Sequence, residues 1–420
     1  MKPLKTILLA ALLGIPAAAG AETPFRTHRY SGFDVLPVTE RNIVFIGNSI
    51  TNMHEWWEAF DNPLVLNRGV SAAVSDELLA HLDPIVKGRP AKVFLMIGTN
   101  DLGTRGIDNA AHVAQNVRRA VARFRNESPR TEVYVQSILP SRRRNLALQR
   151  ETNDSLRAIC REAGATYIDL WDDLLSVSED NQHTLDGLHL SASGYRIWCS
   201  RIAPLVGSPC AYPRNFADYA SGLDRSNGMR ATQFAALPVR TGDVLMIGDE
   251  LVHSGEWHEL LGSERVRSRS IGWGYPGIGI GGISGCLDAI FHGRPDNGTP
   301  AKAFFYVGAA DQCGGRTAEQ MLTDYEAMLA KAHALSPATQ LVVGTLLPVA
   351  DAAVNERVVI PFNDGLRRLA ARNKHIAVAD FYTAMQRDGH PDAEVLPDEY
   401  VNGKGYLRLA ALLRPLLLGK

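Results

Sequence analysis

The chain contains little cysteine, carries no excess of either charge and has no apolar run long enough to span a bilayer. Its five cysteines are few among 420 residues, and none stands in a C-x-x-C pair, which argues against a zinc or redox site. The 44 basic and 45 acidic residues give a formal net charge of −1, so the composition indicates no nucleic-acid or membrane-surface partner. We therefore expect no metal and no cofactor, and the oligomeric state stays open.

The N-terminal segment has the pattern of a secretory signal peptide. Lys2 and Lys5 precede an apolar run over 7–15, and small residues follow it up to Ala21. This run is too short for a transmembrane helix. We expect cleavage after Ala21, which removes residues 1–21 and leaves a periplasmic or secreted protein. An oxidising compartment would permit disulfides, and the spacing leaves two pairs open, Cys199 with Cys210 or Cys286 with Cys313.

The second half of the sequence repeats the first. The apolar run 42–47 follows a Leu-Pro-Val tripeptide, and so does the run 243–248. Further segments match in the same order, and this self-similarity indicates a tandem duplication. We divide the chain into the signal peptide, a first copy over 22–207, a linker over 208–235 and a second copy over 236–420. The other matches include 82–85 with 287–290, 94–98 with 304–308 and 138–140 with 346–348.

Each copy alternates short apolar runs with longer amphipathic stretches. The stretches 110–126 and 146–163 have apolar residues at helical spacing, with charges on the other side. The apolar runs lack polar alternation, as expected for strands buried on both faces. Strands that alternate with helices predict an α/β fold, with a parallel sheet between two layers of helices. In the first copy these runs are 42–47, 92–97, 132–139 and 166–170.

Reactive side chains follow several of the predicted strands. Ser49 comes directly after the first strand, Gly69 after the short run that follows it, and Asn100 after the strand at 92–97. Asp186 and His189 stand just before a predicted helix near the end of the copy. Ligands of open parallel sheets bind at the carboxyl ends of the strands, so we expect these five residues to meet there.

Together these blocks resemble the SGNH (GDSL) hydrolase family. The first copy resembles it throughout and the second copy weakly, which implies two tandem flavodoxin-like domains. The resemblance implies that Ser49 is the nucleophile, His189 the base and Asp186 the residue that orients the base. It also implies an oxyanion hole made of the backbone N–H groups of Ser49 and Gly69 and the side-chain amide of Asn100. The sequence departs from the family at residue 48, which is Asn where Asp is more frequent.

These roles agree with elementary chemistry. A serine hydroxyl becomes a good nucleophile only when a base takes its proton, and a carboxylate on the far imidazole nitrogen holds that base in the correct tautomer. Simpler interpretations exist for single residues, because Ser49 could cap a helix, and Asp186 with His189 could form an ordinary turn. We interpret Asp101 and Trp56 as structural, because the second copy keeps their counterparts, Asp311 and Trp257. His54 and Trp57 lack counterparts and either line the site mouth or lie on the surface.

The second copy keeps the apolar runs and loses the reactive residues. We therefore predict that it is catalytically inactive, with only Gly69 retaining a counterpart, in Gly272. The segment 272–277 matches G-x-G-x-x-G, but it does not follow the first strand, so dinucleotide binding is not expected. The cluster Asp249, Glu250, His253 and His258 is interpreted as a solvated helix start rather than a metal site. The replacements are Glu250 for Ser49, Ala310 for Asn100, Tyr400 for His189 and Pro397 for Asp186.

The substrate is suggested by an arginine run beside the expected site. Arg142, Arg143 and Arg144 follow a strand end, and the second copy has no cation there. We hypothesise that one of them binds a substrate carboxylate, although a solvated loop is an equal alternative. Export and the lack of a long apolar lid favour a small-molecule or glycan ester, and we predict an O-acetylesterase, with sialate esters as the narrowest choice. The alternatives are a lipid-directed esterase (a lysophospholipase or platelet-activating-factor-type acetylhydrolase) and a carbohydrate-binding protein with vestigial catalysis.

Overall fold

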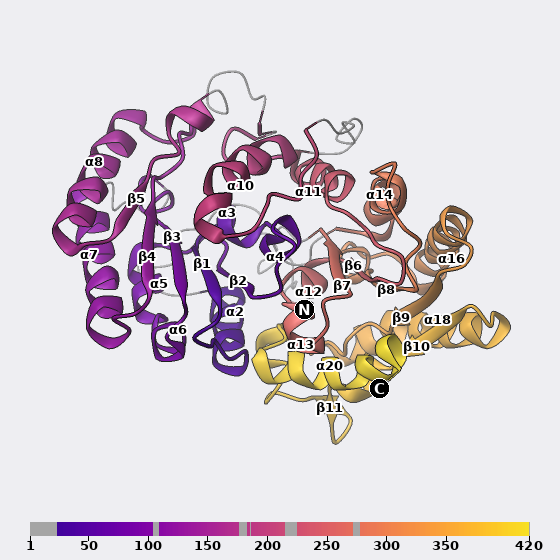
Figure 1. The fold of residues 1–420 in the computed structure, drawn as a ribbon. Coiled ribbons are helices and arrows are strands. Elements are labelled where there is room, and N and C mark those ends of the chain that lie inside the picture. The colour runs from indigo at the N-terminus through magenta and orange to yellow at the C-terminus, as the bar shows by residue number, and fades with distance from the viewer. Residues whose placement is uncertain are drawn as a thin grey trace.

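The computed structural model describes residues 23–103, 109–175, 183–184, 186–214, 225–271 and 278–419. The predicted signal peptide and the glycine-rich segment 272–277 lie outside these residues. Two α/β domains lie side by side, the first in indigo to magenta and the second in orange to yellow (Figure 1). No helix in the described ranges is long and apolar enough to cross a membrane.

The first domain contains a five-stranded sheet in the order β2-β1-β3-β4-β5, in which every pairing is parallel. Phe45 and Phe94 stack at 4.8 Å on one face of this sheet, and Val44 and Ile46 belong to the core on the other. Both faces are therefore covered, which confirms the layered α/β fold that the uninterrupted apolar runs predicted. The strands are β1 (Ile43–Gly47), β2 (Val65–Gly69), β3 (Lys92–Met96), β4 (Glu132–Gln136) and β5 (Thr166–Ile168).

The helices of the first domain follow the predicted periodicity. Asn109 and Asn145 cap the two long helices, accepting hydrogen bonds from backbone N–H groups of the first turn. The second of these helices ends at Gly164, whose φ of +69° is the left-handed conformation that favours glycine. The helices are α2 (Pro24–Val35), α3 (Ser49–Asn52), α4 (Trp56–Ala59), α5 (Ser75–Ala80), α6 (Asp83–Gly88), α7 (Ala110–Glu127), α8 (Leu146–Ala163), the 3-10 helix η1 (Asp172–Leu174) and α10 (Ala192–Val206).

The second domain repeats this plan. Its sheet has the order β10-β9-β8-β6-β7, again with parallel pairings. Val244 lies opposite Val266 and Lys302 of the neighbouring strands, which is the register that Ile43 has in the first sheet. The strands are β6 (Val244–Gly248), β7 (Val266–Ser270), β8 (Lys302–Tyr306), β9 (Gln340–Gly344) and β10 (Ile376–Ala379), with a small hairpin of β11 (Gln386–Arg387) and β12 (His390–Pro391). The helices are α11 (Arg225–Ala236), α12 (Glu250–His253), α13 (Trp257–Leu261), α14 (Ile280–His292), α15 (Ala309–Cys313), α16 (Ala318–Leu335), α17 (Ala352–Val354), η2 (Asn355–Val359), α18 (Ile360–Arg372), α19 (Phe381–Ala384), η3 (Pro397–Glu399) and α20 (Gly403–Leu418).

The helix that precedes each domain packs against the other domain. Helix α2 lies along α20 of the second domain (Figure 1), and α11 lies against α10 of the first. Helix α11 begins at Arg225, inside the segment that we predicted as a linker. The two contacts mirror each other: Ser31 Oγ accepts from Gly403 N, and Thr232 Oγ1 accepts from Ala192 N. This reciprocal arrangement is that of an isologous dimer interface within one chain.

Buried ion pairs occupy the centre of this interface, and they too come in mirror-related sets. Arg68 of β2 makes two hydrogen bonds, of 2.8 and 2.7 Å, to Glu259 of α13. Arg269 of β7 correspondingly contacts Glu58 of α4 at 3.1 and 2.8 Å. All four side chains are nearly or fully buried. Removing one partner of such a pair leaves an uncompensated buried charge, so these contacts make the association of the two domains specific.

Two expectations about the first domain were wrong. His54 and Trp57 line neither a site mouth nor the surface, because both are buried in the interface between the domains. His54 stacks on Tyr195 at 4.0 Å, and burial lowers its pKa to about 3, so its ring is neutral. Trp57 lies between the second domain's His258, whose ring centre is 5.0 Å away, and the guanidinium of Arg267.

Candidate active site

The turn after β1 presents Ser49 at the carboxyl edge of the first sheet. Gly47 ends the strand, and a Cβ on it would lie 2.3 Å from Thr51 Oγ1 and 2.4 Å from Met96 O, so only glycine allows the chain to turn this closely. Asn48 then caps α3, its Oδ1 accepting from Ile50 N at 3.0 Å. Ser49 is the first residue of that helix, where backbone N–H groups have no acceptor within the helix.

Ser49, His189 and Asp186 form a continuous hydrogen-bonded chain. The Oγ of Ser49 lies 2.9 Å from His189 Nε2, and His189 Nδ1 lies 2.7 Å from Asp186 Oδ2. Because a carboxylate only accepts, Nδ1 carries the proton and Nε2 is left as an acceptor for the serine hydroxyl. His189 is 4% exposed and Ser49 6% exposed, so the contact is largely shielded from solvent.

The surroundings of Asp186 keep it ionised. Burial alone would raise the pKa of the Asp186 carboxyl. Three effects outweigh burial and hold this pKa well below the ordinary range: the hydrogen bond from the His189 ring, the electrostatic attraction of that ring, and the backbone N–H groups of Leu188 and His189. These backbone groups and the hydroxyl of Thr184 donate to Oδ1, which leaves Oδ2 for the imidazole. An ionised Asp186 is suited to stabilise an imidazolium.

Asn100 reaches the same edge from the turn after β3. The turn passes through Gly98, whose φ is +122°, and Asn100 is 7% exposed. Its Nδ2 donates to Ala73 O at 3.0 Å, which places the amide beside the loop that follows β2. Asp101 has a structural contact, as predicted: it is fully buried, and Oδ1 accepts from both N and Oγ of Ser75 at the start of α5.

The N–H of Gly69 is already engaged. It donates to Asn67 Oδ1 at 2.9 Å, whereas we had expected it to face an oxyanion. Gly69 is glycine for a different reason, because a Cβ there would lie 2.3 Å from Asn52 N in α3. Further along the same loop, Ala72 has a φ of +63°, the left-handed region that alanine seldom adopts. Strained backbone of this kind concentrates at functional sites.

The three arginines lie beside this chain of residues, on the loop between β4 and α8. Arg143 Nη1 donates to Asp186 Oδ2 at 3.2 Å, although its side chain remains half exposed. Arg144 Nε donates to Thr99 O at 2.9 Å, next to Asn100. Arg142 is exposed. The loop therefore adds positive charge at the edge of the site, and Arg143 contacts the orienting carboxylate itself.

Helix α11 contacts both segments that carry the site, the helix that begins at Ser49 and the start of the helix that follows His189. The sequence patterns did not predict these contacts. Arg230 is fully buried, and its guanidinium donates to Met53 O at the end of α3 and to Glu55. Thr232 accepts from Ala192 N, three residues after His189. The sequence held one hint of an interface between the domains: both copies carry an arginine at the matching position, and Arg68 lies in the buried strand β2 and Arg269 in the buried strand β7.

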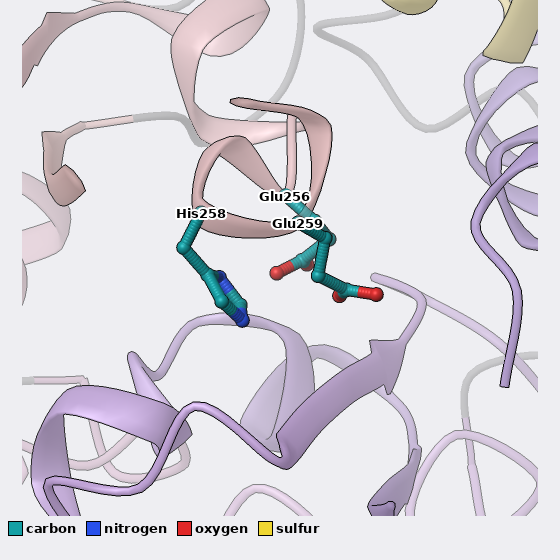
Figure 2. Close-up of side chains that lie close together, drawn as sticks. All are labelled: Glu256, His258 and Glu259. Atoms are coloured by element: carbon teal, nitrogen blue, oxygen red, sulfur yellow. The ribbon is translucent and has the colours of Figure 1, made fainter. Parts of the chain in front are cut away.

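Three neighbouring residues could in principle hold a metal ion. Glu256, His258 and Glu259 extend from α13 and the residue before it toward the first domain (Figure 2). Both carboxylates are already paired with arginines, Glu256 with Arg29 and Glu259 with Arg68. A cation would have to enter between two guanidinium groups, so we assign this cluster to the domain interface.

Comparison with known proteins identifies the family. The family model for GDSL-like lipases and acylhydrolases matches residues 45–197 and 246–408, which is more than half of the chain. The chain belongs to this family. Its members are lipases and acylhydrolases, which supports a hydrolase that cleaves esters. No curated protein matches the sequence.

Several solved structures are similar to one half of this family member. A Streptococcus pneumoniae protein described provisionally as a platelet activating factor is 26% identical, with a TM-score of 0.39, over 43% of this chain and 91% of that one. An acetylxylan esterase from Geobacillus stearothermophilus is 15% identical, with a TM-score of 0.35, over 41% and 97%. A lipolytic G-D-S-L family member from Veillonella parvula is 17% identical, with a TM-score of 0.33, over 41% and 96%.

The second GDSL-like domain repeats the positions of the first with different residues. Asp249 caps α12 as Asn48 caps α3, so Glu250 occupies the position of Ser49. Tyr400 stands three residues before α20, as His189 does before α10. The proposed match of Gly69 with Gly272 was wrong, because strand register places Ser270 opposite Gly248 just as Gly69 lies opposite Gly47.

Proposed function

We propose that the first domain is an exported serine esterase that uses Ser49, His189 and Asp186. The hydrogen-bonded chain from Ser49 Oγ through His189 to Asp186 is the observation that carries this proposal. In the acylation step, Ser49 Oγ attacks the ester carbonyl while its proton passes to His189 Nε2, and the imidazolium then protonates the leaving alcohol. In the second step His189 takes a proton from water as the water attacks the acyl-enzyme, and the imidazolium returns that proton to Ser49 Oγ as the bond to the acyl group breaks and the acid leaves.

The oxyanion would be stabilised by donors that are already in position. We assign two of them to the backbone N–H of Ser49 and the amide of Asn100. The N–H of Gly69 is already bound to Asn67, so we assign the third donor to the backbone N–H of Ala72. Ala72 lies beside Asn100, whose amide donates to the carbonyl of the next residue, Ala73. The left-handed backbone of Ala72 supports this choice, since a turn of that conformation redirects the local N–H groups.

The substrate that fits best is a small acyl ester of a carbohydrate, with an acidic sugar such as sialate as the narrowest form. Arg142, Arg143 and Arg144 support an acidic substrate, because their loop adds positive charge at one edge of the site. A partly exposed guanidinium can bind a carboxylate with two hydrogen bonds. We propose a periplasmic or secreted location from the N-terminal signal pattern.

Covalent labelling tests the proposed nucleophile. A fluorophosphonate should react with the wild-type protein, and mass spectrometry should place the adduct on the peptide that contains Ser49. Glu250→Gln should be labelled equally, and His189→Ala should be labelled at least a hundredfold more slowly. An adduct on another residue, or equal labelling of Ser49→Ala, would refute the assignment.

A further inference from the structure

The second domain has a partly open cavity at the carboxyl edge of its sheet, the place that corresponds to the Ser49 site. Its walls come from the turns after β6, β8 and β9 and from the segment before α20. Helix α2 closes it from the other domain, and its Phe25 and His28 lie 6.3 and 6.1 Å from the ring of Tyr400. Open parallel sheets bind ligands at this edge, so the loss of the reactive residues left a binding site in position.

The cavity lining is mostly apolar and aromatic. Phe25, Tyr306, Tyr400 and Tyr406 contribute rings, and Leu346 and Val349 are among the aliphatic side chains. Such walls exclude water and favour a ligand with a hydrocarbon body. Aromatic faces also attract cations.

Glu250 brings an incompletely satisfied carboxylate into this apolar space. It is 6% exposed, and its Oε1 accepts from Ser254 Oγ at 2.6 Å, while Oε2 has no hydrogen-bond partner among the described residues. Burial raises the pKa of Glu250 to about 7, against the opposing effects of Ser254 and Arg29. A buried carboxylate of this kind is stabilised by a group that supplies both positive charge and N–H donors.

Among the described residues of the cavity wall, no cation is left to pair with Glu250. Arg29 lines the cavity, but its three nitrogens donate to Gly69 O, Ser254 O and Glu256. Burial lowers the pKa of His28, so its ring is neutral near pH 7. The remaining ionisable groups on the wall are the acids Asp249 and Glu399 and the phenols of Tyr306, Tyr400 and Tyr406. Burial raises the pKa of Asp249 well above its usual range, so Glu250 and Glu399 are the acids of the wall that supply negative charge. Neither is paired with an arginine among the described residues, which disfavours an acyl anion or a phosphate as the ligand.

We propose that this cavity binds a small organic ammonium ion, with the ammonium group against Glu250 and the carbon chain against the aromatic rings. The site is separate from Ser49 and does not depend on ester hydrolysis. It gives the inactive copy a function of its own, as a binding domain for amines.

Isothermal titration of the full chain with n-butylammonium chloride, at constant ionic strength and pH 8, tests the proposal. We expect saturable binding of one equivalent, with 1-butanol at least tenfold weaker and butyrate without measurable binding. Glu250→Gln should weaken butylammonium binding at least tenfold. Glu319→Gln, which removes an exposed acid on α16, is the charge-matched control and should bind as wild type does.

A second variant guards against misfolding of the first. Gln312→Lys places a cation in the cavity wall, and it should abolish butylammonium binding while the protein stays folded by circular dichroism. Equal affinities for butanol and butylammonium, unchanged binding in Glu250→Gln, or no binding by the wild type would each overturn the proposal. The Ser49→Ala variant should bind the amine normally, so a failure of the proposed esterase function would be seen separately.

Discussion

Arg230 donates a hydrogen bond of 2.6 Å to the carbonyl oxygen of Met53, which ties the helix before the second domain to the end of the helix that carries Ser49. Its mirror image is Arg29, which donates to Ser254 O at the end of the corresponding helix α12. The second domain therefore supports the helix that carries Ser49, and the first domain supports the matching helix α12. This pair of contacts also offers a matched experiment.

Replacing Arg230 with Met should lower both stability and turnover. Loss of a buried, paired guanidinium leaves Glu55 uncompensated and should cost about 3 kcal/mol of unfolding free energy. Because Met53 and the start of α3 lose their support, kcat for p-nitrophenyl acetate should fall at least tenfold. Arg29→Met, the control, should lose similar stability in urea unfolding but keep its kcat. Equal losses of kcat in both variants would contradict a positioning role for Arg230.

Asn100→Ala should slow catalysis without unfolding the protein. If its amide stabilises the oxyanion, kcat should fall by about 10²-fold, or about 3 kcal/mol in the barrier, with a smaller change in KM. The amide also donates to Ala73 O, so urea unfolding is the necessary control. A decrease in kcat of less than about fivefold would remove Asn100 from the oxyanion hole.

The arginine loop should determine substrate preference. Replacing Arg142, Arg143 and Arg144 together with Ala should reduce kcat/KM for an acidic acetylated sugar at least tenfold more than for a neutral one. Arg143→Ala alone separates two effects, because it also removes a contact to Asp186. The same preference for acidic over neutral esters in wild type and triple variant would refute the acidic substrate.

Glu250 should make stability depend on pH. Its pKa is raised from 4.5 to about 7 by burial, so between these values the native protein binds more protons than the unfolded chain. The free energy of unfolding therefore falls as pH rises through this window, by roughly 3 kcal/mol. Glu250→Gln has no carboxyl to titrate at this position. Its free energy of unfolding in urea, compared with that of the wild type, should therefore increase between pH 4.5 and 8. A constant difference would show that the Glu250 carboxyl titrates normally.

Most of the site could be predicted because each of its residues follows a strand or opens a helix. The sequence shows a strand end before Ser49 and another before Asn100, and a helix start shortly after Asp186 and His189. Parallel strands bring their carboxyl ends to one edge of the sheet, so these residues were expected to meet there. Helices α7 and α8 were predicted from apolar spacing with nearly their observed bounds.

The rest depends on contacts between the domains, which leave little local signal. Arg230 and Thr232 look like ordinary polar residues of a linker until α11 is packed against α3 and α10. The predictions for His54 and Trp57 were wrong because burial by another domain cannot be seen in the local sequence. Gly69 was misassigned as a donor since the side chain of Asn67, two residues earlier, turns back to accept its N–H.

Hydrolysis of p-nitrophenyl acetate, butyrate and octanoate by the mature protein tests the central claim most directly. We expect turnover that is highest on acetate, falls by at least 10³-fold in Ser49→Ala and in His189→Ala, and persists in Glu250→Ala. A preference for octanoate would redirect the substrate toward lipids. Equal activity of the wild type and Ser49→Ala, or loss of activity only in Glu250→Ala, would contradict a serine esterase in the first domain.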